Sequence, residues 1–424
     1  MSDPSIGEAL DARSLAGEIG RSYDVVPYDP GAAVALSLAR VRGVAAVLGL
    51  LPLSDAAPEV LDIGCGGGAQ LLLAAQEGAG RLVGIDASGD ACARARARGA
   101  GLGERWCILH GDAAAVDPAD LGRFDVIYLL GTLYIMPPAA RARVLALLAG
   151  CLKPGGLVVT NYYTGILGMV RTRLGRVLHG ANDAGLPLDQ QLAMVRANLK
   201  VIADVVPAQG VTRDVVQAVV TSMQNSPDTV LFHEALGAVY DPVHTGEVAS
   251  ALGPHGVAFL NYVPPISVGP GEGASAMVRA ADAWDFASGG GFRTVLFARP
   301  PADGGAMGRP TQAGVRHDRV VWSTGLRPGG APGGAPGGAP GAVASFEVPG
   351  GGGIQANTPA AHAMIDRLIA APRCWGDLRV AALGWLAARG QTAPDDAVLD
   401  TSIDDLLLLL WQNGMGWPAW KDVG

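Results

Sequence analysis

The feature that most constrains this chain is residues 60–68, Val-Leu-Asp-Ile-Gly-Cys-Gly-Gly-Gly, an apolar run that breaks into glycines before a second apolar segment at 71–75. The pattern predicts a buried strand, a tight glycine turn and the first turns of a helix. In that arrangement a nucleotide-like ligand lies against bare backbone at the start of the helix. Glycine is needed because a side chain would hold the ligand off, and because such turns use backbone angles that glycine adopts at low cost.

The glycine spacing alone leaves two cofactor classes open. Gly64, Gly66 and Ala69 also satisfy the G-x-G-x-x-G/A pattern of dinucleotide enzymes, so an NAD-dependent oxidoreductase stays an alternative. Asp62, two residues before the first glycine, favours another ligand, since an acid there suits a molecule with a positive end. A second apolar run ends at Asp86, 22 residues after Gly64, and this carboxylate is placed to accept both hydroxyls of a ribose.

Three more segments follow in the order and at the spacing of one enzyme class. They are residues 110–113, the apolar strand 124–130, and 152–159, where Leu-Lys-Pro-Gly-Gly leads into a strand. Together with the two acid-bearing strands, they resemble the S-adenosyl-L-methionine-dependent class I methyltransferases. Five matching segments in this order are specific, although any single one is weak. The resemblance implies S-adenosyl-L-methionine (AdoMet) as cofactor.

Short apolar strands alternate with alanine-rich helices between residues 60 and 159, which predicts an α/β fold with a doubly wound, Rossmann-like methyltransferase sheet. We expect the ligand to lie across the carboxyl ends of the strands, where their loops converge. Asp112 is a candidate for the hydrogen bond to the adenine amino group. The predicted cofactor-binding residues are Tyr23, Asp62, Gly64, Cys65, Gly66, Asp86, Ala87, Asp112, Ala113 and Leu130.

Tyrosines stand where a methyl acceptor usually approaches in this enzyme class. Residues 22–30 form a polar, proline-broken loop with two tyrosines, which is either a surface turn or a lid over the cofactor. Tyr134 follows the fourth strand, and it either orients a substrate nitrogen or oxygen or fills a corner of the core. Residues 161–164, after the fifth strand, hold more hydrogen-bonding side chains than a core strand needs. The predicted catalytic residues are Tyr28, Tyr134, Tyr162 and Tyr163.

Residues 168–265 change character and predict a helical insertion, with helices at 168–178, 190–205 and 211–224. Both ends of the insertion are tied to the catalytic domain, so we expect it to form one wall of the acceptor site. The neighbours His233 and Glu234 invite a catalytic or metal role. No further ligand stands at metal spacing, however, so a capping or packing role is favoured and no metal is expected.

A narrower resemblance rests on residues 23–28, the glycine turn, and 232–243 with Phe-His-Glu and Tyr-Asp-Pro-Val. These segments are similar to bacterial methyltransferases that carry a methyltransferase regulatory domain, some of which are protein lysine methyltransferases. The resemblance implies in-line transfer to a nitrogen of a peptide or protein. Leu133 and Ile135 depart from that family, which tends to have a tyrosine and a tryptophan there. A small-molecule O- or N-methyltransferase and a non-catalytic AdoMet-sensing adaptor therefore stay alternatives.

The chain of 424 residues is long enough for several domains, and its 61 glycines and 29 prolines point to extensive loops. A four-residue Gly-Gly-Ala-Pro repeat at 329–340 cannot bury a core. The predicted domains are an AdoMet-binding domain at 1–165 with an N-terminal lid at 1–30, a helical regulatory or substrate domain at 166–300, a flexible linker at 301–358, and a winged-helix-like module at 359–424.

Charge and cysteine usage limit the partners and the compartment. The net charge is −8 with only 17% charged residues, so there is no basic footprint for nucleic acid. The five cysteines are scattered without C-x-x-C spacing, as in reduced cytoplasmic proteins. The N-terminus does not resemble a signal peptide, and the apolar stretches are too short or too interrupted for membrane insertion. The oligomeric state is left open.

Overall fold

The computed structural model describes residues 17–51, 56–205, 211–237, 241–266, 274–301, 307–328, 344–348, 353–356 and 358–421. The chain divides into two compact units. The first comprises Met1–Val34, Ala56–Phe259 and Val268–Pro300, and the second comprises Ala35–Asp55, Leu260–Ser267 and Pro301–Gly424.

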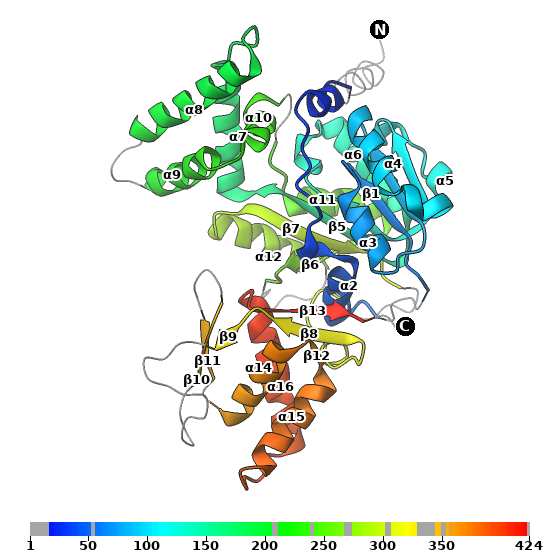
Figure 1. Ribbon diagram of the computed structural model, residues 1–424, viewed down its shortest axis with the longest axis vertical. Coiled ribbons are helices and arrows are strands. Elements are labelled where there is room, and N and C mark those ends of the chain that lie inside the picture. Colours follow the sequence, from blue (N-terminus) through cyan, green and yellow to red (C-terminus); the bar gives the residue numbers. More distant parts are fainter. Residues whose placement is uncertain are drawn as a thin grey trace. The chain divides into compact units, whose positions relative to one another are not determined.

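The first unit is built on a mixed sheet with the strand order β3-β2-β1-β4-β5-β7-β6 (Figure 1). β1 to β5 are parallel neighbours, and β7 runs antiparallel beside β5. The order reverses between β1 and β4, where doubly wound sheets form a ligand crevice. The sheet confirms the predicted α/β, Rossmann-like fold. Its strands are β1 (Val60–Ile63), β2 (Leu82–Asp86), β3 (Trp106–His110), β4 (Phe124–Leu129), β5 (Leu152–Thr164), β6 (Ala258–Val263) and β7 (Gly291–Ala298).

The central strands are nearly continuous apolar runs, and every residue of β1 is buried. Such strands form where helices cover both faces of a parallel sheet. The connecting helices place the carboxyl ends of the strands at one edge, which is where a ligand site is expected. These connections are α3 (Ala69–Gln76), α4 (Gly89–Arg98), η2 (Ala100–Arg105), η3 (Ala113–Ala115), α5 (Pro118–Leu121), η4 (Leu133–Ile135) and α6 (Pro138–Cys151).

The N-terminal segment differs from its prediction. Residues 17–25 are helical, so Tyr23 lies on a helix where the sequence predicts a loop. The amide of Val26 donates to the Ser22 carbonyl at 2.9 Å and closes the last turn. Pro27 has no N–H to continue the ladder, which ends the helix there. Residues 1–16, which belong to the predicted N-terminal lid at 1–30, lie outside the described residues.

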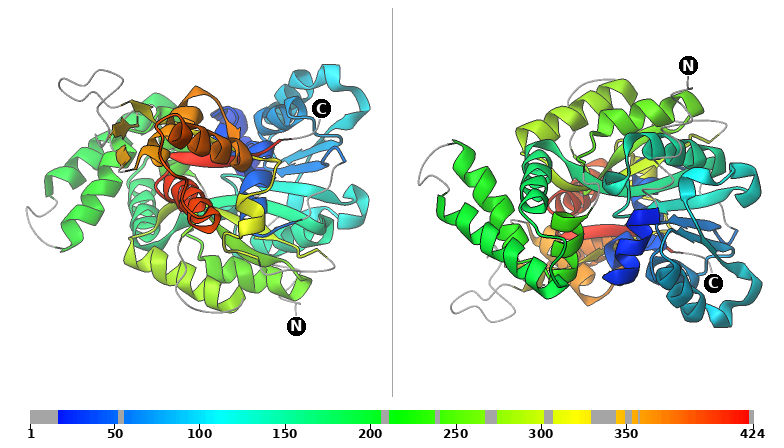
Figure 2. Two further views of the ribbon diagram at one scale, coloured as in Figure 1. Left: turned by 90° about the horizontal axis from the view of Figure 1, so that it is seen from below. Right: turned by 90° about the horizontal axis from the view of Figure 1, so that it is seen from above.

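The predicted helical insertion is confirmed, and its first four helices have a core of their own. The pair α8 and α9 projects away from the sheet in all three views (Figures 1 and 2). Apolar side chains at helical spacing pack together, among them Leu178, Leu199, Val220 and Leu231. The helices are α7 (Gly165–Gly180), α8 (Leu188–Val205), α9 (Val211–Gln224), α10 (Asp228–Leu236) and α11 (Thr245–Leu252), which leads through η5 (Gly253–His255) to β6, α12 (Ala274–Ala287) and β7.

The second unit contains two small antiparallel sheets, β12-β8-β13 and β11-β10-β9. Its first helix, α2, comes from the region predicted as part of the AdoMet-binding domain. Gly43 of α2 has no room for a side chain, since a Cβ there would lie 2.6 Å from the Ala419 backbone. The elements are η1 (Val34–Leu36) at the boundary, α2 (Leu38–Val47), α13 (Gln312–Val315), β8 (Val320–Thr324), β9 (Arg327–Pro328), β10 (Ala344–Glu347), β11 (Gly353–Ala356), α14 (Pro359–Ala370), β12 (Arg373–Cys374), α15 (Trp375–Ala387), α16 (Asp396–Gln412) and β13 (Gly416–Trp420).

The prediction of a flexible linker at 301–358 is wrong for residues 307–328, which contain α13, β8 and β9, and for residues 344–347 and 353–356, which form β10 and β11. In β8 the side chains of Val320 and Trp322 alternate with a less buried residue, and both are buried in the core of the second unit. The repeat at 329–340 lies outside the described residues. The winged-helix-like character of the C-terminal module stays a prediction. Among the described helices, none has the length and apolarity to cross a bilayer.

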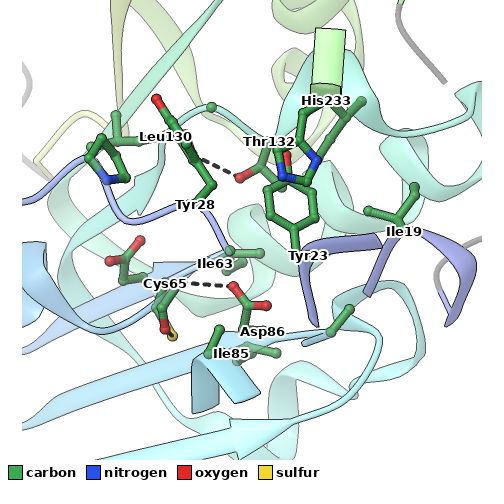
Figure 3. Close-up of a pocket in the computed structure, with 18 of the residues that line it drawn as sticks. Ile19, Tyr23, Tyr28, Ile63, Cys65, Ile85, Asp86, Leu130, Thr132 and His233 are labelled. Carbon is green, nitrogen blue, oxygen red and sulfur yellow. Dashed lines mark hydrogen bonds between the residues drawn. The ribbon is translucent and has the colours of Figure 1, made fainter. Parts of the chain in front are cut away.

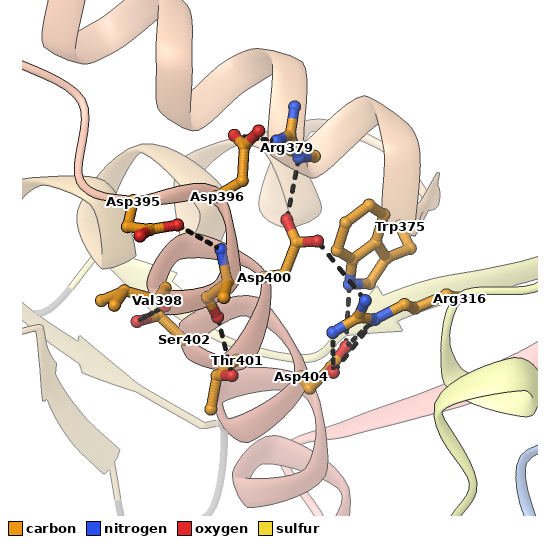
Figure 4. Close-up of polar contacts among 11 residues, drawn as sticks. Arg316, Trp375, Arg379, Asp395, Asp396, Val398, Asp400, Thr401, Ser402 and Asp404 are labelled. Carbon is orange, nitrogen blue, oxygen red and sulfur yellow. Dashed lines mark hydrogen bonds and ion pairs between the residues drawn. The ribbon is translucent and has the colours of Figure 1, made fainter.

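A network of ion pairs holds the helices of the C-terminal module together (Figure 4). Asp404 on α16 is buried and accepts hydrogen bonds from Arg316 Nη2 at 2.7 Å and from Trp375 Nε1 at 2.9 Å. Arg316 also pairs with Asp400, at 3.4 Å, and Asp400 accepts from Arg379 at 2.9 Å. One carboxylate thus ties α16 to α15 and to the segment before β8.

We expect Asp404→Ala to destabilise the second unit by about 1.5–2 kcal/mol, because it leaves an indole N–H and a guanidinium without their shared acceptor. Asp405→Ala, at the exposed neighbouring position, is the matched control and should change stability by less than about 0.5 kcal/mol. Urea unfolding followed by tryptophan fluorescence measures both, since most tryptophans lie in this unit. Equal midpoints for the two variants would contradict a stabilising role for the network.

Candidate functional site

A cavity of about 370 Å³ lies at the carboxyl ends of β1, β2 and β4 (Figure 3). This volume is within the range of small-molecule and cofactor sites. The floor comes from the loops after the strands, and the cover comes from the N-terminal segment and from α10. The cavity therefore occupies the position predicted from the strand order.

The glycine turn after β1 permits the close approach of backbone that forms the floor. Gly64 has φ of +75°, and a Cβ there would lie 2.3 Å from Thr132 Oγ1 in the loop after β4. Gly66 has φ of +51°, and a Cβ there would meet nothing within 4 Å. Both positions favour glycine by conformation, and the first requires it by space as well. A ligand can thus lie directly against the backbone of this turn.

Two carboxyl groups face the same cavity from neighbouring strands. Asp86 accepts hydrogen bonds from the amides of Gly66 and Ser88, each at 2.8 Å. Asp62 is buried, and desolvation, with a smaller contribution from the Asp86 charge, raises its pKa to about 7. Burial also raises the pKa of Asp86, although its two amide donors oppose this shift. An acidic pair of this kind favours a ligand that brings positive charge and hydroxyl donors.

The N-terminal segment is held over the cavity by contacts with two elements, α10 and α4. The Tyr23 ring stacks on the His233 ring of α10, with centroids 3.9 Å apart, and His233 Nε2 donates to the Val26 carbonyl at 2.8 Å. Asp24 accepts a hydrogen bond from Ser88 Oγ at the start of α4. Asp29 pairs with Arg98 of α4 at 2.8 Å. Through these contacts the N-terminal segment covers the cavity and connects α10 to α4.

The predicted acceptor side of the cavity, around Tyr134, is aromatic. The ring of Tyr134 meets those of Tyr163 and Phe292 edge to face, with centroids 5.3 Å and 6.0 Å apart. Tyr28 and Phe292 line the cavity yet are 37% and 48% exposed, so they stand at its mouth. Burial raises the pKa of Tyr134 well above its ordinary value, which keeps its phenol protonated. We call Tyr28, Tyr134 and Phe292 the aromatic rim.

A buried ion pair stands at the cavity next to these rings. Arg171 of α7 pairs with Glu234 of α10, and both side chains are buried. The Tyr163 hydroxyl donates to the second oxygen of Glu234 at 3.2 Å. The carboxylate is therefore neutralised and fixed where it contacts the cavity.

All of the residues predicted to bind the cofactor line this cavity. The predicted catalytic residues differ in whether they reach the cavity. Tyr28 and Tyr134 line the cavity, and Tyr163 lies behind them against Phe292, with centroids 4.8 Å apart. Tyr162 does not reach it: this residue is fully buried, and its hydroxyl lies 2.9 Å from Thr245 Oγ1 of α11.

The expectation for Tyr162 fails because residues 161–164 belong to β5 and do not follow it. Pairing with β7 continues β5 as far as Thr164, opposite Gly291. Successive side chains of a strand point to opposite faces, so Asn161 and Tyr163 share one face while Tyr162 takes the other. Asn161 lines the cavity, where its Oδ1 accepts from the Gly131 amide at 2.6 Å.

Three of the residues that line the cavity were not among the predicted site residues. The sequence favoured a capping or packing role for His233 and Glu234, and it did not single out Phe292. His233 and Glu234 line the cavity together with Val230, so α10 forms one wall of the cavity. That this wall belongs to the acceptor site stays a prediction. Phe292 reaches the site because β7 returns beside β5, with Phe292 opposite Tyr163. A site role for His233 and Glu234 could have been recognised from the sequence, because two adjacent polar residues interrupt an apolar helix. No local pattern indicates a site role for Phe292, since its position depends on the pairing of distant strands.

Comparisons with known proteins find one family model that matches part of the chain and solved structures with a similar fold. Residues 60–156 match the family model of a methyltransferase domain. The structure is similar to that of PKMT2 from Rickettsia typhi in complex with AdoHcy, with a TM-score of 0.76 and 16% identity, over 93% of this chain and 77% of that chain. A second structure of PKMT2 from Rickettsia typhi gives a TM-score of 0.76 and 16% identity, over 92% of this chain and 77% of that one. No curated protein matches the sequence.

The residues of the cavity fit AdoMet. A carboxylate at the end of β2 suits the hydroxyl donors of a ribose, and Asp86 lies there, beside a glycine turn without side chains. The ionised form of Asp62 is costly in a buried cavity, and a positive ligand offsets this cost. Among the described residues, no three histidine, cysteine, aspartate or glutamate side chains are grouped to hold a metal.

The pKa of Asp62 predicts how AdoMet affinity depends on pH. With a pKa of about 7, Asp62 is mostly ionised at pH 8 and mostly protonated at pH 6. The wild-type chain should therefore bind AdoMet more tightly than Asp62→Asn at pH 8, by up to about tenfold, and this advantage should shrink towards pH 6. Calorimetry of both proteins at the two pH values measures the ratio. A ratio that stays constant would contradict a charge interaction with Asp62.

Proposed function

We propose that this chain, a class I AdoMet-dependent methyltransferase, methylates an amine nitrogen of a peptide or protein. The observation that carries the proposal is the aromatic rim at the mouth of the cofactor cavity. Aromatic faces hold the aliphatic stem of an amine and its methylated, cationic product. The methyl acceptor is thus expected to enter past Tyr28 and Phe292 and to end near Tyr134.

The chain's own residues favour attack by a neutral amine. AdoMet supplies a methyl group on its sulfonium, and the acceptor nitrogen must lie in line with the bond that breaks. Holding that alignment is the main contribution of the protein. Arg171 neutralises Glu234, so no free carboxylate in this wall fixes the acceptor as an ammonium ion. Desolvation also disfavours the charged amine. Burial lowers the pKa of His233, which is therefore neutral in the same wall.

A peptide or protein acceptor is supported by the open mouth and by the resemblance. Two half-exposed aromatic side chains at the entrance suit an extended side chain that arrives from a larger molecule. The motifs at 23–28 and 232–243 resemble protein lysine methyltransferases, and the similarity to the PKMT2 fold covers 93% of this chain. We place the enzyme in the cytoplasm because its five scattered cysteines fit a reducing compartment. A regulatory role for residues 166–300 is part of the same proposal.

We expect Phe292→Ala to raise the KM for lysine-centred peptides by roughly tenfold, because the acceptor stem loses an aromatic contact. The affinity for S-adenosylhomocysteine should stay within about twofold. Phe286→Ala is the matched control, since Phe286 is 71% exposed and does not line the cavity. Steady-state kinetics with radiolabelled AdoMet measures these effects. Turnover of small phenols or amines with no turnover of any peptide would contradict the proposed acceptor.

A further inference from the structure

A buried arginine outside the cavity holds the loop that carries Tyr134. Arg141 lies in the first turns of α6 and is only 8% exposed. Its Nε donates to the Leu133 carbonyl at 3.2 Å, and its Nη2 donates to the Met136 carbonyl at 3.3 Å. These two carbonyls lie on either side of Tyr134. A single planar guanidinium thus spans the turn η4 and fixes it at both ends.

The helical insertion holds the same turn from the other side. The amide of Asp241, in the segment after α10, donates to the Tyr134 carbonyl at 2.8 Å. Two residues later the amide of Val243 donates to the Tyr163 carbonyl, also at 2.8 Å. Both tyrosines of the acceptor side are therefore fastened through their backbones to one short segment of the insertion.

Ion pairs join the two sides of this arrangement. The Asp241 carboxylate lies 3.7 Å from Arg141 Nη2 and 4.0 Å from Arg176 Nη2 of α7. Glu247 of α11 lies 4.0 Å from Arg141 Nη1. A buried guanidinium is tolerated when its charge is compensated and its N–H groups are hydrogen-bonded. Here the two carboxylates compensate the charge of Arg141, and the two carbonyls accept its hydrogen bonds. We call Arg141, Asp241 and the backbone of residues 133–136 the Tyr134 clamp.

We infer that Arg141 is a positioning residue for methyl transfer, which acts with Asp241 to fix Tyr134 against Tyr163 and Phe292. Loops after strands are mobile unless they are tied down, and a misplaced acceptor loop would lose alignment between nucleophile and methyl carbon. The clamp also joins the insertion to the acceptor loop, so that the two move as one. The kinetic part of this inference rests on the proposed function, whereas the clamp itself is independent of the acceptor.

The test compares Arg141→Gln, Arg141→Lys and Asp241→Asn with Arg143→Gln, an exposed position on the same helix. Arg141→Gln should lower kcat on lysine-centred peptides between about tenfold and a hundredfold, while the KM for AdoMet and the affinity for S-adenosylhomocysteine stay within about twofold. Arg141→Lys keeps the positive charge but cannot donate to both carbonyls with one planar group. Its kcat should therefore lie between those of Arg141→Gln and wild type. Arg143→Gln should behave as wild type.

Hydrogen–deuterium exchange supplies a readout that needs no acceptor. The amides of Asp241 and Val243 should exchange faster in Arg141→Gln than in Arg143→Gln, with S-adenosylhomocysteine bound in both. Unchanged exchange and unchanged kcat in Arg141→Gln would overturn the inference. If Arg141→Gln does not fold, Arg141→Lys and Asp241→Asn decide by the same two readouts. If wild type methylates no peptide, the proposed function fails, while exchange still decides the clamp.

Discussion

The hydrogen bond from the Gly66 amide to the Asp86 carboxylate is the contact on which the site depends. It joins the turn after β1 to the end of β2 and keeps the acid beside a stretch of bare backbone. The absence of a side chain at Gly64 lets the loop after β4 come within contact of the same turn. Together these constraints place the floor of the cavity.

The insertion completes this site in two ways. α10 supplies His233 and Glu234 to the cavity wall, where they contact the N-terminal segment and the acceptor side. The segment that follows α10 fastens Tyr134 and Tyr163 through their backbones. A helical region with a core of its own therefore shapes the entrance and also fixes the residues behind it.

The floor of the site was predictable from the sequence because its determinants are local. Glycines, acids and apolar runs at fixed spacing identify the turn after β1, Asp62 and Asp86 without knowledge of the rest of the chain. Tyr162 shows the limit, since an error in the end of β5 assigned it to the cavity when strand alternation turns it away. Phe292, Arg141 and the packing of α2 in the second unit depend on distant pairings, which no local pattern encodes.

We propose that this enzyme transfers methyl groups from AdoMet to protein nitrogen. The most direct measurement is incubation of the chain with AdoMet labelled in its methyl group and an extract of the source cells, followed by mass spectrometry of proteins and small molecules. We expect label on amine nitrogens of one or a few proteins, with equal formation of S-adenosylhomocysteine. Label confined to the small-molecule fraction, or label on protein that also appears with Asp86→Ala, would contradict it.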